Sequence, residues 1–143
     1  MDGVPDTCGG VAMNYCSTAA NSVDPVGATI RHLGSLKVSE NNFMLEASPV
    51  PNSFGLFYFG PDQTSVPFGD GFRCVTGPTF RFLFAIASGN VARQLVDFEA
   101  PGTVDSQIDA GETWNFQYWY RDVNGPGGTA LNLSDGLNVF FGL

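Results

Sequence analysis

The sequence predicts an all-β domain: an antiparallel β-sandwich of the jelly-roll or immunoglobulin-like kind, with about eight strands and an extended N-terminal arm. The composition is the first reason, because 18 glycines, 9 prolines and only 14% charged residues suit short strands and tight turns better than helices. The second reason is that polar and apolar residues alternate in short segments between turn residues, as in sheets with one buried face. The length of 143 residues is enough for one hydrophobic core.

The N-terminal segment, residues 1–27, shows no sustained periodicity and is rich in small residues and turn formers. We therefore expect an extended arm there, followed by a sandwich domain at 28–143. The first strands of that domain are expected at 28–33 ("ATIRHL") and 42–48 ("NFMLEAS"), where apolar and polar residues alternate.

Later strands are predicted by further apolar or alternating runs, in chain order 54–60, 72–75, 79–87, 91–98, 113–122 and 136–143. Between them, 61–71 is expected to be a loop because it holds two prolines and a Gly-Asp-Gly turn, and 99–112 a second long loop. In 79–87, a period of two predicts that Phe80, Phe82 and Phe84 share one face.

The stretch "WNFQYWYRD" at 114–122 is dense in aromatic residues, and a period of two divides it into two faces. The apolar face, expected in the core, carries Trp114, Phe116, Tyr118 and Tyr120. The opposite face carries Asn115, Gln117, Trp119 and Arg121. Trp119 is the best candidate for an exposed sugar platform, because an indole can cover the C–H face of a pyranose while Gln117 and Arg121 bond its hydroxyls. Tyr58 and Arg73 are outer candidates for the same site. The alternative is that Trp119 packs under the 61–71 loop or against the arm.

Several aspartates lie in loops rich in Gly, Pro or Asn: Asp62, Asp70, Asp122 and Asp135. Calcium prefers carboxylate and carbonyl oxygens of this kind, so calcium is the cofactor to consider, with Asp70, Asp122 and Asp135 as its ligands. No EF-hand pattern is present, and the alternative is that each aspartate starts a turn. We also expect an ion pair between Asp135 and Arg121.

Motifs for catalysis are missing from the sequence. A glycosidase needs two carboxylates across a cleft, and the four glutamates show no mutual spacing that predicts one: Glu40, Glu46, Glu99 and Glu112. The sequence has no GxSxG elbow, and the single histidine, His32, lies alone on a predicted strand. We therefore expect a protein that is not an enzyme.

The three cysteines are Cys8, Cys16 and Cys74. Without a CxxC pair and with one histidine they do not suit zinc, so one disulfide and one remaining thiol is the simplest interpretation. A Cys16–Cys74 bond would tie the arm to the core, whereas Cys8–Cys16 would close a small loop. We favour the first.

The formal net charge is −8, which argues against a nucleic-acid partner because phosphate binding needs a basic patch. The same charge disfavours sulfated or uronate-rich polymers, although a local basic cluster could override it.

No apolar run has the length of a membrane span, so we expect no membrane insertion. The start "MDGVPDTCGG" lacks the basic and apolar regions of a signal peptide, so secretion would imply that the signal has been removed.

A family resemblance rests on five pieces of the chain: "YCSTAANS" (15–22), "GLFYFGPDQTSVPFGDGFRCV" (55–75), "DFEAP" (97–101), "AGETWNFQYWYRD" (110–122) and "LNLSDGL" (131–137). In these pieces the chain resembles secreted all-β accessory domains of exported proteins from Planctomycete- and myxobacterium-like organisms. The resemblance implies an exported, non-catalytic domain and also supports Cys16 and Cys74 as the paired cysteines.

The leading hypothesis is therefore an extracellular carbohydrate-binding module that binds a polysaccharide. The alternative is a cell-surface or filament subunit that self-associates through residues 1–27, because an extended arm can add a strand to a neighbouring sheet. An unrecognised hydrolase is the third hypothesis.

Overall fold

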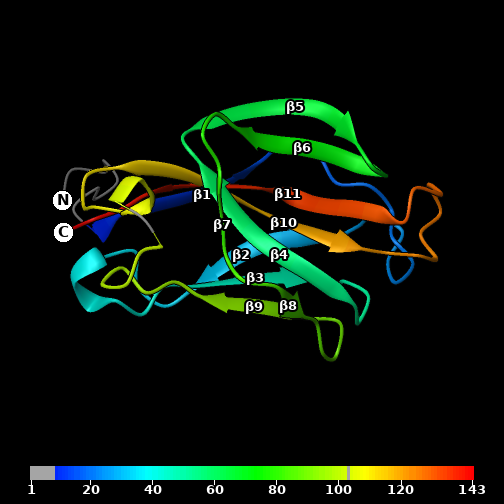
Figure 1. Cartoon of the computed structure of the whole chain (residues 1–143), viewed down its shortest axis with the longest axis horizontal. Coiled ribbons are helices and arrows are strands. Elements are labelled where there is room, and N and C mark those ends of the chain that lie inside the picture. Colours follow the sequence, from blue (N-terminus) through cyan, green and yellow to red (C-terminus); the bar gives the residue numbers. More distant parts are fainter. Residues whose placement is uncertain (1–8, 103) are drawn as a thin grey trace, which may run out of the picture.

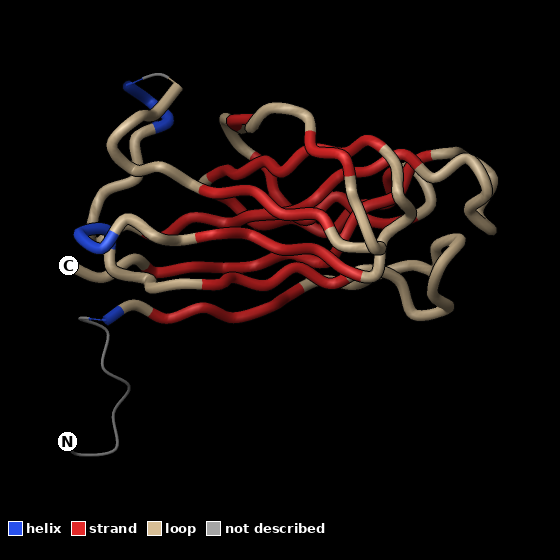
Figure 2. Tube along the Cα trace, turned by 90° about the horizontal axis from the view of Figure 1, so that it is seen from below, coloured by secondary structure: helices blue, strands red, loops and turns tan. Residues whose placement is uncertain are grey.

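The computed structural model describes residues 9–102 and 104–143 and confirms an antiparallel β-sandwich (Figure 1). Eleven strands are present: β1 (Val11–Tyr15), β2 (Thr29–Leu33), β3 (Met44–Ser48), β4 (Phe54–Gly60), β5 (Asp62–Phe68), β6 (Gly71–Thr76), β7 (Phe80–Arg81), β8 (Ala85–Ile86), β9 (Ala92–Leu95), β10 (Thr113–Arg121) and β11 (Leu131–Phe140). Two short 3-10 helices, η2 (Val38–Glu40) and η3 (Val104–Ser106), lie in loops at the end of the molecule that holds the C-terminus (Figure 2).

The strands form two facing layers and one additional hairpin. The large sheet has the order β1-β11-β10-β4-β7, with β8 also paired to β4, and the small sheet has the order β2-β3-β9. The remaining strands, β5 and β6, form a separate hairpin that lies outside the large sheet (Figure 1). We call these parts the large sheet, the small sheet and the β5–β6 hairpin.

The main core lies between the two sheets because alternate residues of each strand point inward. From the small sheet and its flanks, the predicted inward set at 42–48 is confirmed, since Phe43, Leu45 and Ala47 are all buried. From the large sheet, Phe116 lies 5.6 Å from Phe43 between ring centroids, and Tyr118 lies 4.5 Å from Phe57. The predicted core face of β10 is therefore confirmed.

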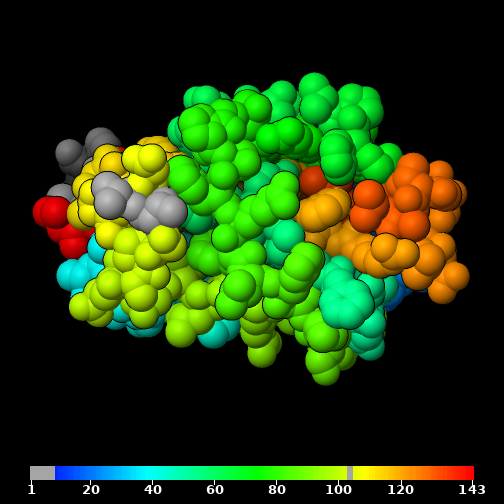
Figure 3. All heavy atoms as spheres, in the orientation of Figure 1, coloured from blue at the N-terminus to red at the C-terminus, as the bar shows by residue number. Residues whose placement is uncertain are grey.

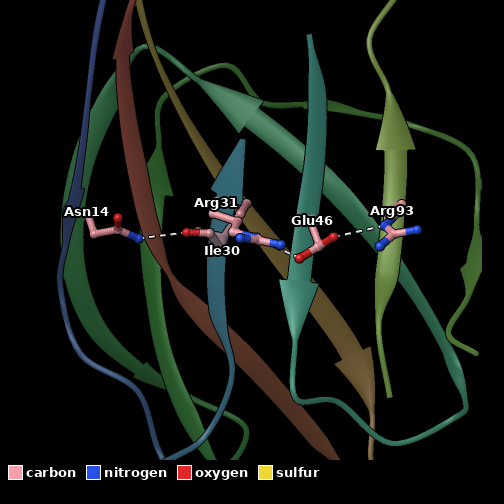
Figure 4. A network of polar contacts seen from close by, with 5 residues as sticks. All are labelled: Asn14, Ile30, Arg31, Glu46 and Arg93. Carbon is pink, nitrogen blue, oxygen red and sulfur yellow. Dashed lines mark hydrogen bonds and ion pairs between the residues drawn. The ribbon is translucent and has the colours of Figure 1, made fainter. Parts of the chain in front are cut away.

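A chain of polar contacts crosses from the large sheet over the small sheet (Figure 4). Asn14 on β1 donates a hydrogen bond to the carbonyl oxygen of Ile30 on β2, at 2.7 Å. On β3, the buried carboxylate of Glu46 pairs with Arg31 on β2 at 2.6 Å and with Arg93 on β9 at 2.8 Å. These contacts fix the register of β2, β3 and β9 on the outer face of the small sheet.

The structure corrects several boundaries. Residues 11–15, expected in an arm, form β1 and pair with β11 of the same chain, so this part of the arm belongs to the sandwich. The expected loop at 61–71 is wrong, because most of it forms β5 despite its prolines. The expected single strand at 79–87 is broken into β7 and β8, which leaves Phe84 73% exposed, away from the core that Phe80 and Phe82 contact. The strand count therefore exceeds eight.

The β5–β6 hairpin covers part of the outer face of the large sheet and is attached there covalently. The predicted disulfide between Cys16 and Cys74 is present and joins the segment after β1 to β6. Tyr15 also donates a hydrogen bond to the carbonyl oxygen of Cys74 at 2.7 Å. Its ring lies against Gly136, where an added Cβ would come within 2.4 Å of the ring, so a larger residue does not fit. Cys8 lies outside the described residues.

A small second core fills the space beneath the hairpin. Its buried members are Leu56, Tyr58, Val75 and Leu133, and Trp119 packs against them partly buried. The molecule therefore has two apolar layers, one between the sheets and one between the large sheet and the hairpin.

Candidate functional site

The candidate site is the part of the outer face of the large sheet that the hairpin leaves uncovered. Strand register places Trp119 on β10 directly between Leu56 on β4 and Leu133 on β11. Tyr58, two residues after Leu56, is paired with Arg81 on β7, so Arg81 reaches the same face. Trp119 thus lies in the middle of this face, with arginines toward its margins.

Two hollows adjoin Trp119, and we call them together the Trp119 groove. The larger, about 390 Å³, is lined by Phe54, Gly55, Phe84, Trp119, Tyr120, Arg121 and Leu131. The smaller, about 120 Å³, is lined by Leu56, Tyr58, Phe68, Arg73, Thr79, Arg81, Trp119 and Leu133. Figure 3 shows this face, with a recess between the hairpin at the top and the segment of β7 and β8 below it.

Aromatic side chains form the floor and the walls of the groove. Phe54 at the start of β4 is 57% exposed and Phe84 between β7 and β8 is 73% exposed, which is unusual for side chains of this size. The indole of Trp119 is partly buried and lines the same hollow, and its Nε1 atom is buried without a hydrogen-bond partner among the described residues. The solvent-facing part of this ring is therefore carbon, which suits stacking on C–H groups.

Three arginines line the groove. Arg121 is exposed at the end of β10, and Arg81 lies at the opposite margin on β7. Arg73 on β6 donates a hydrogen bond from its Nε to the carbonyl oxygen of Val75 at 2.9 Å, which orients it along the hairpin. Among the described residues, none of the three forms an ion pair within 4.0 Å of a carboxylate, since both ion pairs found involve Glu46.

Gln117 does not belong to the accessible surface, although the sequence placed it beside Trp119. Its side chain is 0% exposed and holds the hairpin onto the sheet. The amide oxygen accepts hydrogen bonds from the backbone N–H of Cys74 at 2.9 Å and from the Tyr58 hydroxyl. The amide nitrogen donates to the carbonyl oxygens of Phe72 at 2.8 Å and Ser134 at 2.6 Å. With both amide atoms engaged, Gln117 has no group left for a ligand.

Tyr58 lines the groove through its ring alone. Burial raises the pKa of its hydroxyl well above the usual range, against a smaller opposing effect of the Arg73 charge. The hydroxyl therefore stays protonated and donates to Gln117 at all ordinary pH values. Of the five residues predicted to bind a ligand, Trp119, Arg121, Arg73 and Tyr58 line the groove and Gln117 does not.

The predicted calcium ligands are not brought together as a set of three. Asp70 and Asp122 converge on Gly125, where an added Cβ would lie 2.7 Å from Asp70 Oδ2 and 3.0 Å from Asp122 Oδ2. Asp70 Oδ1 accepts hydrogen bonds from the backbone N–H and hydroxyl of Thr129. Within the described part of the chain, no group of three or more His, Cys, Asp or Glu residues could hold a metal ion. The arrangement matches the alternative in which the aspartates organise turns.

Asp135 lies elsewhere and has a structural role. Its Oδ1 accepts a hydrogen bond from the backbone N–H of Ile30 at 2.9 Å, and its Oδ2 accepts one from Asn14 at 3.0 Å. Burial raises the pKa of this carboxyl group, although both hydrogen bonds act to lower it. The expected pair with Arg121 is wrong, because Arg121 is paired in register with Leu131 at the start of β11, whereas Asp135 lies in the middle of that strand and bonds to Ile30 and Asn14.

Two of the side chains that a hydrolase could use, His32 and Glu112, are engaged in structural contacts. The ring of His32 is stacked on Phe43 at 5.8 Å, and burial lowers its pKa. Glu112 accepts hydrogen bonds from the Asp109 backbone N–H at 2.8 Å and from Trp114 Nε1 at 3.2 Å, which fix the loop before β10.

A third hollow, about 670 Å³, lies between the open margins of the two sheets. It is lined by parts of β7 and β9 and by the loop around η3. Its apolar floor includes Phe59, Phe82 and Phe98. Thr79 and Arg81 line both this hollow and the smaller hollow of the Trp119 groove, so the two adjoin there.

Comparison of the chain with protein-family models, with curated proteins and with solved structures finds no match. In the described residues, no helix has the length and apolar character needed to cross a membrane. The groove therefore has to be interpreted from its own chemistry.

Three residues of the groove were not predicted from the sequence: Phe54, Phe84 and Arg81. Phe84 is exposed because the strand is interrupted at 82–84.

Proposed function

We propose that this protein is a non-catalytic, extracellular carbohydrate-binding module that binds a polysaccharide in the Trp119 groove. The observation that supports this function is the combination of three aromatic side chains, Phe54, Phe84 and Trp119, around one open hollow. Exposed aromatic groups are costly to keep in water, and a cluster of them at one place marks an interaction surface.

The chemistry of the groove suits a sugar chain better than a wholly apolar ligand. Pyranose rings present C–H faces that stack on aromatic carbon and hydroxyl edges that need hydrogen-bond donors. Aromatic carbon is supplied by the floor and walls, and donors by Arg121 at one margin and Arg81 at the other. The groove is open and consists of two hollows that share the Trp119 ring, so more than one sugar unit can lie along it.

An extracellular location agrees with the covalent chemistry of the chain. The disulfide between Cys16 and Cys74 forms and persists in oxidising compartments, and it is rare in reducing ones. It also secures the hairpin that forms one wall of the groove.

Affinity electrophoresis against a panel of neutral and acidic polysaccharides tests the proposal. Phe84→Ala removes an exposed wall of the groove at little cost to folding, and we expect at least about tenfold weaker binding of the polymer that retards the wild type. Met13→Ala is the matched control, because Met13 is a comparably exposed apolar residue on β1, outside the groove. Retardation that is unchanged in Phe84→Ala and Trp119→Ala, or the absence of retardation by any polymer, would refute a polysaccharide-binding role for the groove.

The alternative is a filament or surface subunit that assembles through its arm, and one part of that arm is already engaged within the chain. Residues 11–15 already pair with β11 of their own chain, so they are not free to complete a neighbour's sheet. Size-exclusion chromatography with and without reductant distinguishes the two functions, since the binding module requires no oligomer.

A further inference from the structure

The distribution of charge around the Trp119 groove is opposite to that of the whole protein. The chain carries 14 acidic and 6 basic residues, yet three of the basic residues and none of the acidic ones line the two hollows beside Trp119. Two of the other basic residues, Arg31 and Arg93, share the single carboxylate of Glu46 on the small sheet. Four basic side chains therefore form no ion pair among the described residues, and three of these four line the groove; the fourth is Lys37.

Within the described part of the chain, the arginines at the groove have no carboxylate partners, although the protein carries an excess of acidic residues. An isolated guanidinium in a protein of net charge −8 would find carboxylates close by if charges were distributed at random over the surface. The nearest acidic residue in sequence to Arg121 is Asp122, but it is buried, and its carboxylate accepts a hydrogen bond from the backbone N–H of Ser22. Asp70, in the hairpin turn, accepts hydrogen bonds from Thr129 through its Oδ1, while its Oδ2 is buried without a partner among the described residues. Among the described residues neither carboxylate forms an ion pair with Arg121, which stays exposed.

The arrangement of the arginines around the rings adds a geometric constraint. Arg121 lines the hollow on one side of Trp119, and Arg81 and Arg73 line the hollow on the other side. A sugar stacked on Trp119 would thus have a guanidinium group beyond each of its two ends. Guanidinium groups bind carboxylates through two parallel N–H···O bonds, which a neutral hydroxyl cannot match.

We propose that the polysaccharide bound in this groove is acidic, and that its sugar units carry carboxylates, as in a polyuronate. This inference rests on the proposed function and specifies its ligand class. The rings of Phe54, Phe84 and Trp119 take the C–H faces of successive pyranoses, and Arg81 and Arg121 take their carboxylates. The overall negative charge, which by itself disfavours an acidic polymer, is overridden locally by the arginine cluster.

The decisive probes are polygalacturonate and its fully methyl-esterified form, which share the same ring and backbone but differ in charge. We expect polygalacturonate to retard the protein, with at least tenfold weaker binding of the ester and with binding that weakens as salt is raised. Arg121→Gln and Arg81→Gln should each weaken polygalacturonate binding at least about fivefold and weaken binding of the ester by a clearly smaller factor, because the ester keeps only the hydroxyl contacts of these arginines. Lys37→Gln is the matched control, because it removes the same charge from an exposed residue far from the groove in the fold.

The possible results distinguish failure of the acidic-ligand proposal from failure of the proposed polysaccharide-binding function. Equal binding of polygalacturonate and its ester, lost in Phe84→Ala but not in the arginine variants, would overturn the acidic ligand and keep the polysaccharide-binding function. Retention of dextran sulfate and not of polygalacturonate would overturn the carboxylate and indicate a sulfate ester instead. The absence of retardation by these three polymers would overturn the acidic ligand, and the absence of retardation by every polymer of the neutral and acidic panel would overturn both proposals.

Discussion

Replacing Gln117 with leucine is expected to destabilise the fold strongly, although the sequence suggests a surface residue. The side chain is 0% exposed and satisfies three backbone groups and one hydroxyl at once. Leucine has a similar volume and can make none of these bonds. A buried polar group left without a partner costs about 1–3 kcal/mol, and part of that cost is relieved when the hairpin shifts and water enters. We therefore expect a loss of about 4 kcal/mol in the free energy of unfolding.

Urea denaturation followed by tryptophan fluorescence measures this loss, with the m-value as a check that both states remain comparable. For a domain of this size the same loss corresponds to roughly 12–16 °C in Tm. Gln94→Leu on β9 is the matched control, because Gln94 makes one hydrogen bond, to the carbonyl oxygen of Leu95, and should lose less than about 0.5 kcal/mol. A loss below about 1 kcal/mol in Gln117→Leu, with an unchanged m-value, would show that Gln117 does not hold the hairpin.

Two further predictions concern stability. The pKa of Glu46 is lowered overall, because hydrogen bonds and charges from Arg31 and Arg93 outweigh the opposing effect of burial. The contribution of Glu46 to the free energy of unfolding is thus present above the unfolded pKa and is lost as pH falls from about 5 through the folded pKa. Glu46→Gln should therefore lower the free energy of unfolding by about 1 kcal/mol at pH 7 and by much less near pH 3. Urea titrations that give an equal loss at both pH values would contradict this. Replacing both Cys16 and Cys74 with serine opens a loop with a sequence separation of 58 and should lower the free energy of unfolding by about 4 kcal/mol. The loss is measured as a lower Tm, and a loss under about 1 kcal/mol would contradict the prediction.

Much of the fold could be predicted from local patterns because each strand carries its own alternation. The segment at 42–48 and the stretch at 113–121 each place most of their apolar residues on one face, and both faces are in the main core. With three cysteines only a few disulfide pairings exist, and the one that ties the N-terminal segment to the core, Cys16–Cys74, is present. These features depend on residues that lie close in sequence or on simple counting.

The composition of the groove could not be predicted, because it depends on which segments lie over which strands. A polar residue on the outer face of β10 has the same sequence pattern whether the hairpin covers it, as with Gln117, or leaves it open, as with Arg121. Arg81 reaches the site only through its pairing with Tyr58, a contact between distant parts of the sequence. The prediction that Phe84 shares a face with Phe80 and Phe82 is wrong because the strand is interrupted at 82–84, so the alternation of faces does not continue there.

The separation of the apolar interior into two layers has an evolutionary consequence. Folding depends mainly on the layer between the sheets, whereas the groove is built on the thin layer under the hairpin and on the segment joining β7 to β8. Changes in Phe84 or Arg81 therefore leave the main layer untouched, and insertions at 83–84, where both side chains are exposed, lengthen a surface connection without altering a paired strand. Under the proposed function, this arrangement lets ligand preference diversify among descendants that retain the same scaffold, and it makes 83–84 a suitable place to graft new specificity by design.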